Sequence, residues 1–169
     1  MSVTTPWMQI AEQMATAIAE VTNAGVVHTR QRYIKEWSTF LDQFATEVDG
    51  VRIIRGWQIV PERPYESTIE SLGPAPVFSD SLRFMIRGVN GADDSESYED
   101  FLTVAYEVKR KLDITQDFSL AGISDVEIVR AYPCDIVGYN MRVFGAIACW
   151  TAELVRVVEV LRTETMEVS

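Results

Sequence analysis

The stretch FGAIACWTAELVRVVEV, residues 144–160, is the strongest strand candidate in this chain and decides its fold class. Its side chains alternate with the period of two that is typical of a β-strand. Its second half also fits a helix, because Leu154, Val158 and Leu161 are three and four residues apart, but the many valines favour a strand. The predicted faces are Ala146, Ala148, Trp150, Ala152 and Leu154 on one side, and Cys149, Thr151, Glu153 and Val155 on the other.

Four further segments on the N-terminal side of this strand have the composition of strands. They are residues 26–30, 51–60, 82–88 and 126–132, and the last ends or bends at Pro133. Residues 82–88 alternate most clearly between apolar and polar side chains. Leu82, Phe84 and Ile86 are therefore expected to point inward, and Arg83, Met85 and Arg87 outward.

Three segments have helical periodicity. Residues 6–23 begin at Pro6, which suits a first helical turn, after Thr4 or Thr5 as a cap. Residues 34–44 form a second, shorter helix, and a third runs from about residue 95 to 111, with acids at its start and bases at its end. The expected buried stripes are Trp7, Ala11, Met14, Ile18 and Val21 in the first helix, and Tyr98, Phe101, Leu102, Ala105, Val108 and Leu112 in the third.

These elements predict a single α+β domain that spans residues 1–169. Because the strands are largely adjacent in sequence, we expect an antiparallel or mixed β-sheet of about four to five strands, with the helices packed on one face. The segment 61–80 is expected to be a long loop, since residues 61–76 contain four prolines and a glycine. Residues 113–124 are also expected to be a loop, and residues 162–169 a polar tail.

The composition excludes several classes of protein. A net charge of −10 argues against a dedicated nucleic-acid binder, although such a surface keeps a protein soluble or lets a duplex slide past it. Cys134, Cys149 and the single histidine, His28, cannot supply a Cys₂His₂ metal site. The N-terminus lacks the pattern of a signal peptide, and no apolar stretch approaches the roughly 18 residues of a membrane span. The sequence thus predicts a cytoplasmic origin, no membrane partner, and cysteines that fill the core.

No motif in the sequence indicates an enzyme. His28 has no recognisable nucleophile arranged with it, and the acidic stretch GADDSESYED, residues 91–100, does not have the ligand spacing of an EF-hand. The glycines form no phosphate-binding loop. We therefore predict a non-enzymatic protein with no catalytic residue, no cofactor and no metal.

Two features favour a role in assembly. The segment 61–80 carries apolar residues within a polar frame, which suits docking on a partner. The second is the abundance of aromatic residues, including Trp7, Trp37, Trp57 and Trp150, because tryptophan is enriched at interface hot spots, although the core is the default place for each. Separately, basic residues cluster locally and could pair with the acidic run of a neighbouring subunit, or could simply be solvated charges on strand faces. The candidate contact residues, between subunits or with a partner, are Arg30, Arg32, Arg55, Tyr65, Ile69, Leu72, Phe78, Asp93 and Asp94.

The segment VHTRQRYIKEWSTFLDQF, residues 27–44, and the strand IRGWQIV, residues 54–60, resemble bacteriophage tail-terminator (tail-completion) proteins. In that family a Val-His-x-x-x-Arg-Tyr stretch precedes a helix with Trp and Phe, and a Gly-Trp strand follows. The resemblance spans roughly residues 1–160 and is looser over residues 61–80 and 113–135. The matching positions are Val27, His28, Arg32, Tyr33, Trp37, Phe40, Gly56, Trp57, Ile86, Arg87, Gly88, Phe144, Gly145, Cys149, Trp150, Ala152 and Glu153.

The resemblance implies a sheet flanked by helices and a structural role in the virion. Proteins of this type form a hexameric ring that caps the head-proximal end of the tail tube, stops its growth and meets the neck or connector. The implied partners are other copies of the chain, the tail tube protein and the head-tail connector, with DNA passing through the lumen without specific binding. The alternatives are another head-to-tail joining protein, such as a stopper, or a tube subunit, and then a small α+β ligand-binding domain or enzyme.

Overall fold

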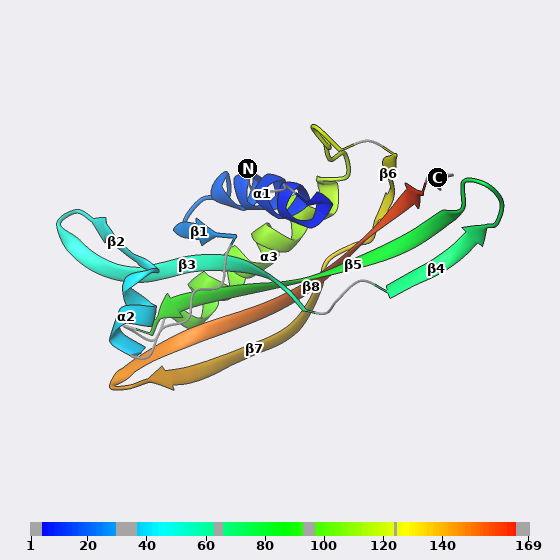
Figure 1. Cartoon of the computed structure of the whole chain (residues 1–169). Coiled ribbons are helices and arrows are strands. Elements are labelled where there is room, and N and C mark those ends of the chain that lie inside the picture. The colour runs from blue at the N-terminus through cyan, green and yellow to red at the C-terminus, as the bar shows by residue number, and fades with distance from the viewer. Residues whose placement is uncertain (1–4, 30–36, 63–65, 93–96, 124, 165–169) are drawn as a thin grey trace.

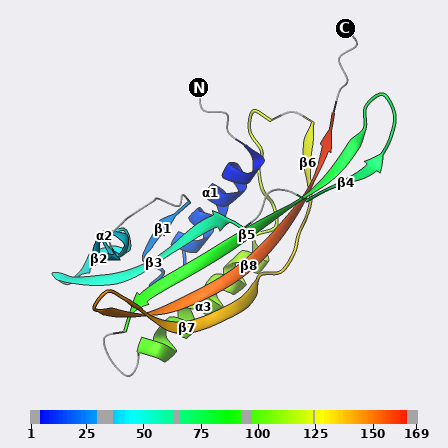
Figure 2. The same ribbon diagram turned by 60° about the horizontal axis from the view of Figure 1, so that its bottom comes forward.

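A long, twisted β-sheet carries two helices across one face and a short helix at one end of the other (Figures 1 and 2). The computed structural model describes residues 5–29, 37–62, 66–92, 97–123 and 125–164. The elements are α1 (Pro6–Ala19), β1 (Val26–His28), α2 (Trp37–Asp42), β2 (Ala45–Val48), β3 (Val51–Pro61), β4 (Glu66–Ser71), β5 (Val77–Gly91), α3 (Ser97–Ile114), β6 (Val126–Ala131), β7 (Asp135–Phe144) and β8 (Ile147–Thr163).

The two longest strands, β5 and β8, form the centre of the sheet and pair antiparallel over their whole length (Figure 2). Their pairing begins at Val77 with Thr163 and ends at Gly91 with Cys149. Each is long enough for two shorter strands to pair along its outer side. β3 and β4 share one side of β5, and β6 and β7 share one side of β8. β1 pairs parallel with β3, so the sheet is mixed.

The α+β class is confirmed, and of the two predicted alternatives, antiparallel or mixed, the sheet is mixed, but it is larger than predicted. It contains eight strands among the described residues, against the expected four to five. Three of these strands lie outside the predicted ones: β2, β4 and β7. Of these, β7 alternates clearly, with Val137, Tyr139, Met141 and Val143 apolar at every second position. β2 and β3 form a hairpin whose turn is Asp49-Gly50, where both residues have positive φ. β7 contains Gly138 and Asn140, which have low strand propensity, and it is formed by pairing with β8.

The prediction of a loop over residues 61–80 is wrong. Residues 66–71 are β4, and residues 77–80 begin β5, so that the two strands form a hairpin. The prolines did not prevent this, because Pro61 ends β3 and Pro74 and Pro76 lie between the paired strands. The predicted tail also begins later, since β8 continues to Thr163, and residues 165–169 lie outside the described residues.

Helices α1 and α3 cover one face of the sheet and form the main core with it (Figure 1). The side chain of Thr5 caps α1 by accepting a hydrogen bond from the Met8 backbone N–H at 3.2 Å, as predicted, although the helix ends at Ala19. Tyr98 and Leu102 are exceptions to the predicted stripe of α3, since they are exposed and half-buried. The buried positions of these helices are Ile10, Ala11, Met14, Ala17 and Ile18 in α1, and Ser97, Phe101, Ala105, Val108 and Leu112 in α3.

Helix α2 lies on the opposite face, so the prediction that the helices pack on one face holds only for α1 and α3. Leu41 of α2 packs with Val89 and Cys149 in a separate small cluster. Successive side chains of a strand point to opposite faces, and Trp57, directly across from Gly88, belongs to the main core. Val89 must therefore point away from α1 and α3. One end of the second face is thus covered, while the rest carries polar side chains together with an apolar row in which Val60, Met85 and Val155 lie directly across from one another.

The irregular segment after α3, residues 115–123, is tied to the core by polar contacts. Gln9 and Gln13 of α1 use their amide groups to pair with the backbone of Ala121 and Ser119, with four hydrogen bonds of 2.7–2.9 Å. The fully buried Arg156 donates from Nη2 to the backbone oxygen of Thr115 at 2.7 Å. The predicted loop at 113–124 starts two residues later, at residue 115, because α3 continues to Ile114, and it follows a defined path.

Candidate functional site

Four of the nine candidate contact residues lie in the described part of the chain, at two separate places. Arg55 lies on β3, close to the end of α1. The other three share the hairpin of β4 and β5: Ile69, Leu72 and Phe78. The remaining candidates lie outside the described residues: Arg30, Arg32, Tyr65, Asp93 and Asp94.

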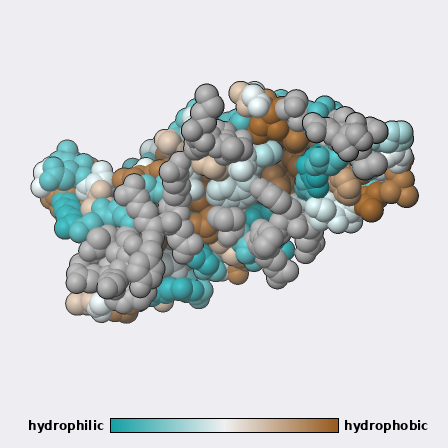
Figure 3. Space-filling view, in the orientation of Figure 1, coloured by the Kyte–Doolittle hydropathy of each residue, from teal (hydrophilic) through white to brown (hydrophobic). Residues whose placement is uncertain are grey.

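The β4–β5 hairpin ends in an apolar tip, formed by Ile69 and Leu72. Their exposed fractions are 61% and 82%. The hairpin projects at one end of the molecule (Figure 1), and hydrophobic atoms are visible at that end in the space-filling view (Figure 3). Phe78 lies directly across from Ile69, but the Arg162 guanidinium covers its ring at 4.8 Å from the ring centre. The tip is therefore a surface that a partner could cover, whereas Phe78 belongs to the body of the hairpin.

A buried carboxylate holds the base of this hairpin to the sheet. Asp80 on β5 accepts a hydrogen bond from the Ser67 hydroxyl at 2.6 Å and from Nε of Arg162 at 2.9 Å. The network thus joins β4, β5 and β8. Burial alone would raise the pKa of Asp80, but the hydrogen bonds from Arg162 and Ser67 outweigh it and hold the pKa below its usual value. Hydrogen bonds to Asp80 and Glu164 raise the pKa of Arg162.

This network predicts a pH-dependent contribution to stability. Because folding lowers the pKa of Asp80, its contribution is complete above the unfolded-state pKa, about 3.9, and is lost as the pH falls through the lower folded-state pKa. We expect Asp80→Asn to lower the free energy of unfolding by about 1.5–3 kcal/mol at pH 7, and the difference from wild type to vanish in acid. Urea unfolding across this pH range would measure it.

The matched control is Glu70→Gln on β4 of the same hairpin, where the side chain is exposed. This variant removes the same charge without touching the network at the base. Its unfolding free energy should follow the wild-type pH profile. A constant difference between Asp80→Asn and wild type from pH 7 down to pH 2 would contradict the role given to the carboxylate.

Arg55 is held within the chain by two asparagines. Its Nε donates to Oδ1 of Asn90 at 3.1 Å, and its Nη1 donates to Oδ1 of Asn23 at 3.4 Å. Asn23 lies in the turn that follows α1, and Asn90 lies near the end of β5. Arg55 therefore connects the helix layer to the sheet, and its contact with a second subunit stays a prediction.

A pocket between α2 and the second face of the sheet was not predicted. Its volume is about 350 Å³. We call it the α2 pocket and define it by the aromatic residues Phe40, Phe44 and Phe144 and by the polar residues Gln58, Arg87, Arg142 and Glu153. The alternation of β5 predicts the outward direction of Arg87, and that of β8 places Glu153 with Cys149 and Thr151. Neither pattern gives the register between β5 and β8, which places Arg87 beside Glu153. Arg142 lies on β7, a strand that was not predicted.

The remaining chemically notable residues have structural surroundings. His28 Nε2 lies 2.7 Å from the backbone oxygen of Gln43, and its ring meets that of Phe44 edge-on at 5.6 Å. Cys134 and Cys149 are fully buried and form no disulfide bond, and burial raises the pKa of Cys134 to about 12. Among the described residues, no three His, Cys, Asp or Glu side chains are grouped to hold a metal ion, and no helix has the length and apolarity to cross a membrane.

Two features of the described chain are thus candidates for function. The first is the apolar tip of the β4–β5 hairpin, and the second is the α2 pocket near the other end of β5. The function has to be argued from these residues. No protein-family model and no curated protein sequence matches this chain.

Proposed function

We propose that this chain is a structural, non-enzymatic protein of a bacteriophage tail. It forms a ring that caps the head-proximal end of the tail tube, ends tube polymerisation and joins the tail to the neck. The observation that carries the proposal is the apolar tip of the β4–β5 hairpin. The order of residues shared with tail-completion proteins, from Val27 to Trp57 and again from Phe144 to Glu153, supports it.

The hairpin tip has the form of a contact between subunits. A two-stranded arm that exposes Leu72 and Ile69 leaves apolar surface in water, and burying such a side chain fully contributes about 1.5–3 kcal/mol. An arm that reaches from one copy to a different surface of the next makes a heterologous contact. Such contacts generate a closed ring when the rotation between copies closes, and an open filament when it does not.

The charge of the chain fits a position around DNA. At −10, a ring of several copies has a strongly negative total charge, which repels phosphates. DNA would pass through the lumen without specific binding. In this proposal the partners are other copies of the chain, in a homohexameric ring, the tail tube protein and the head-tail connector, and the protein resides in the virion.

The mass of the purified protein, alone and with tail tubes of the same phage, tests the proposal. Light scattering would give the mass in solution, and electron microscopy would show what binds to the tubes. We expect a single ring at one end of each tube. Stacked rings along the tube would identify a tube subunit instead, and a chain that leaves tubes unchanged would contradict the proposal.

Replacing Leu72 by serine should weaken ring formation specifically. The side chain is exposed, so the free energy of unfolding of the single chain should change by no more than about 0.5 kcal/mol. Association between copies, measured by analytical ultracentrifugation with tube ends present, should weaken about tenfold or more per contact. Val51→Ser is the matched control, since Val51 is also an exposed apolar side chain, with an exposed fraction of 62% against 82% for Leu72, and lies in the other hairpin. Equal association of Leu72→Ser and wild type would contradict the role of the tip.

A further inference from the structure

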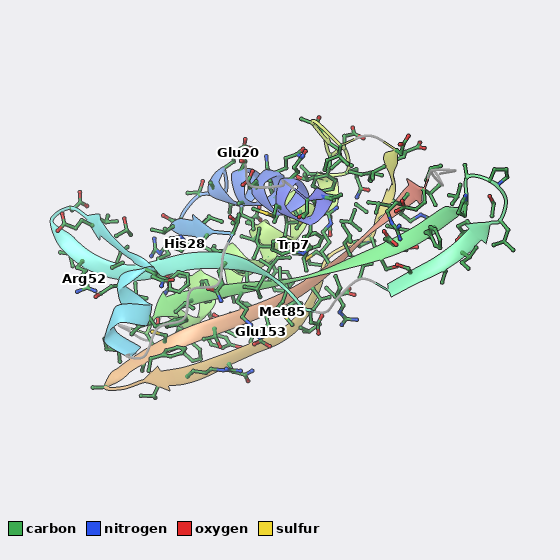
Figure 4. All side chains as sticks on the ribbon, in the orientation of Figure 1. Trp7, Glu20, His28, Arg52, Met85 and Glu153 are labelled. Atoms are coloured by element: carbon green, nitrogen blue, oxygen red, sulfur yellow. The ribbon has the colours of Figure 1, made fainter. Side chains whose placement is uncertain are left out.

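The α2 pocket combines an aromatic wall with a row of polar side chains on neighbouring strands. Phe40 packs against Phe44 and Phe144, with ring centres 5.4 and 5.5 Å apart. Gln58, Arg87 and Glu153 lie directly across from one another on β3, β5 and β8, so all three point to the same face. Figure 4 shows Glu153 on the side of the sheet away from α1. The register thus places these polar groups beside the aromatic wall.

The charges in this pocket do not cancel. Arg87 Nε lies 3.6 Å from Oε1 of Glu153, and Arg142 Nη2 lies 3.7 Å from the same oxygen. Both separations exceed the length of a hydrogen bond. Within the described part of the chain, the two guanidinium groups make no hydrogen bond to another residue, so their N–H groups are available to a ligand. Two arginines and one glutamate give a local charge of +1 in a chain of −10.

The fourth polar side chain of the pocket is that of Gln58 on β3. Gln58 has an exposed fraction of only 6%, yet it lines the pocket with its side chain directed to the face that carries Arg87. A glutamine amide can donate through its nitrogen, next to the two guanidinium groups. The polar donors of the pocket therefore converge on a region that is bounded by phenylalanine rings. Sites that bind small organic groups usually combine apolar walls with a few polar groups in this way.

We propose that the α2 pocket binds a carboxylate carried on an apolar body. The carboxylate meets Arg87 and Arg142, which match its planar geometry, and the body lies against Phe40, Phe44 and Phe144. The ligand is a single negative charge, because a dianion would place its second charge against Glu153. A cation is excluded because Glu153 already has two arginines beside it. The same chemistry can come from a free aromatic acid or from a glutamate beside an apolar residue in a peptide.

The experiment is a titration of the ¹⁵N-labelled full chain, followed through the backbone amides of Gly88, Val89 and Thr151 around the pocket. One arm uses phenylacetate, and a second uses an acetylated, amidated Phe-Glu dipeptide. Phenylacetamide is the neutral control in both arms. We expect saturable shifts with at least one acid and none with the amide, and the arm with the higher affinity identifies the source.

Variants test the charge arrangement. Arg87→Gln and Arg142→Gln should each weaken binding about tenfold, because a charge-assisted hydrogen bond is lost. Glu153→Gln should strengthen binding about threefold or more, because it removes the competing carboxylate, a result that damage to the fold would not produce. Arg83→Gln is the matched control, since Arg83 lies on the same strand and face but pairs with Glu62. No shifts with either acid at 20 mM, or equal affinities in all four variants, would overturn the proposal.

Discussion

Replacing Gly25 by alanine is expected to lower the free energy of unfolding by about 2–5 kcal/mol. Gly25 has a φ of +83°, a conformation that costs an L-residue about 1–2 kcal/mol. In addition, a Cβ there would lie 2.2 Å from the backbone oxygen of Arg55 and 2.8 Å from its Cγ. Neither a backbone oxygen nor the root of a side chain can move away easily, so β1 would have to separate from β3, adding about 1–3 kcal/mol.

A matched control isolates the effect of this clash. Gly50 in the turn between β2 and β3 has nearly the same φ, +77°, but a Cβ added there meets no other atom within 4 Å. Gly50→Ala should therefore cost only the conformational part, about 1–2 kcal/mol. Urea unfolding of both variants gives the two free energies. Equal losses in the two variants would show that the close approach of β1 to β3 is not what requires glycine at position 25.

Replacing Trp57 by alanine is expected to cost about 3–5 kcal/mol of unfolding free energy, the second large effect. The ring is fully buried and lies over Gly88, whose added Cβ would come within 2.7–2.8 Å of its atoms. Phe101 of α3 meets the same ring, with centres 5.7 Å apart. Trp57 thus fills the space that Gly88 leaves between the sheet and α3, and its removal creates a cavity in the main core.

Two further variants show whether this fit explains the cost. Trp57→Phe keeps a ring and removes a buried indole N–H that has no partner among the described residues, so it should cost less than about 2 kcal/mol. Gly88→Ala should cost about 1–3 kcal/mol in the wild type and clearly less in the Trp57→Phe background, since the two sites are in contact. Additive losses in the double variant would contradict the proposed fit.

The sequence predicted the elements that carry their own periodic pattern. Residues 82–88 alternate as expected, with Leu82, Phe84 and Ile86 buried and Arg83 and Arg87 exposed. The strand predicted over 144–160 is β8 only from Ile147, because Phe144 ends β7 and Ala146 lies in the turn between the two strands, and from Ala148 onward the predicted faces agree with the register of β8. The helix stripes are confirmed in large part: Ala11, Met14 and Ile18 of α1 and most of the α3 positions are buried, whereas Trp7 and Val21 are half-buried and Val21 lies beyond the end of α1. In each case a local pattern of apolar residues is enough, because burial of one face determines the structure.

The candidate site was predicted less completely, for a physical reason. The apolar residues Ile69 and Leu72 marked the segment of the β4–β5 hairpin as a candidate contact surface. Its conformation was predicted wrongly as a loop, because the sequence does not distinguish prolines at a tight turn from prolines within a long loop. The α2 pocket had no signal in the sequence. Its arginines belong to β5 and β7, its glutamate to β8, and no local pattern links residues on different strands.

By itself, then, the sequence determined which faces of β5 and β8 are buried and most of the buried faces of α1 and α3, together with the α+β class and the acidic character of the chain. Only the tertiary structure decided that α2 lies on the second face, that β4 and β7 pair as strands, and that Arg87, Arg142 and Glu153 meet. The features that the sequence determined follow from composition and from patterns among residues that are near in sequence. The features that only the tertiary structure decided depend on strand register, which is set when distant segments bury their apolar faces together.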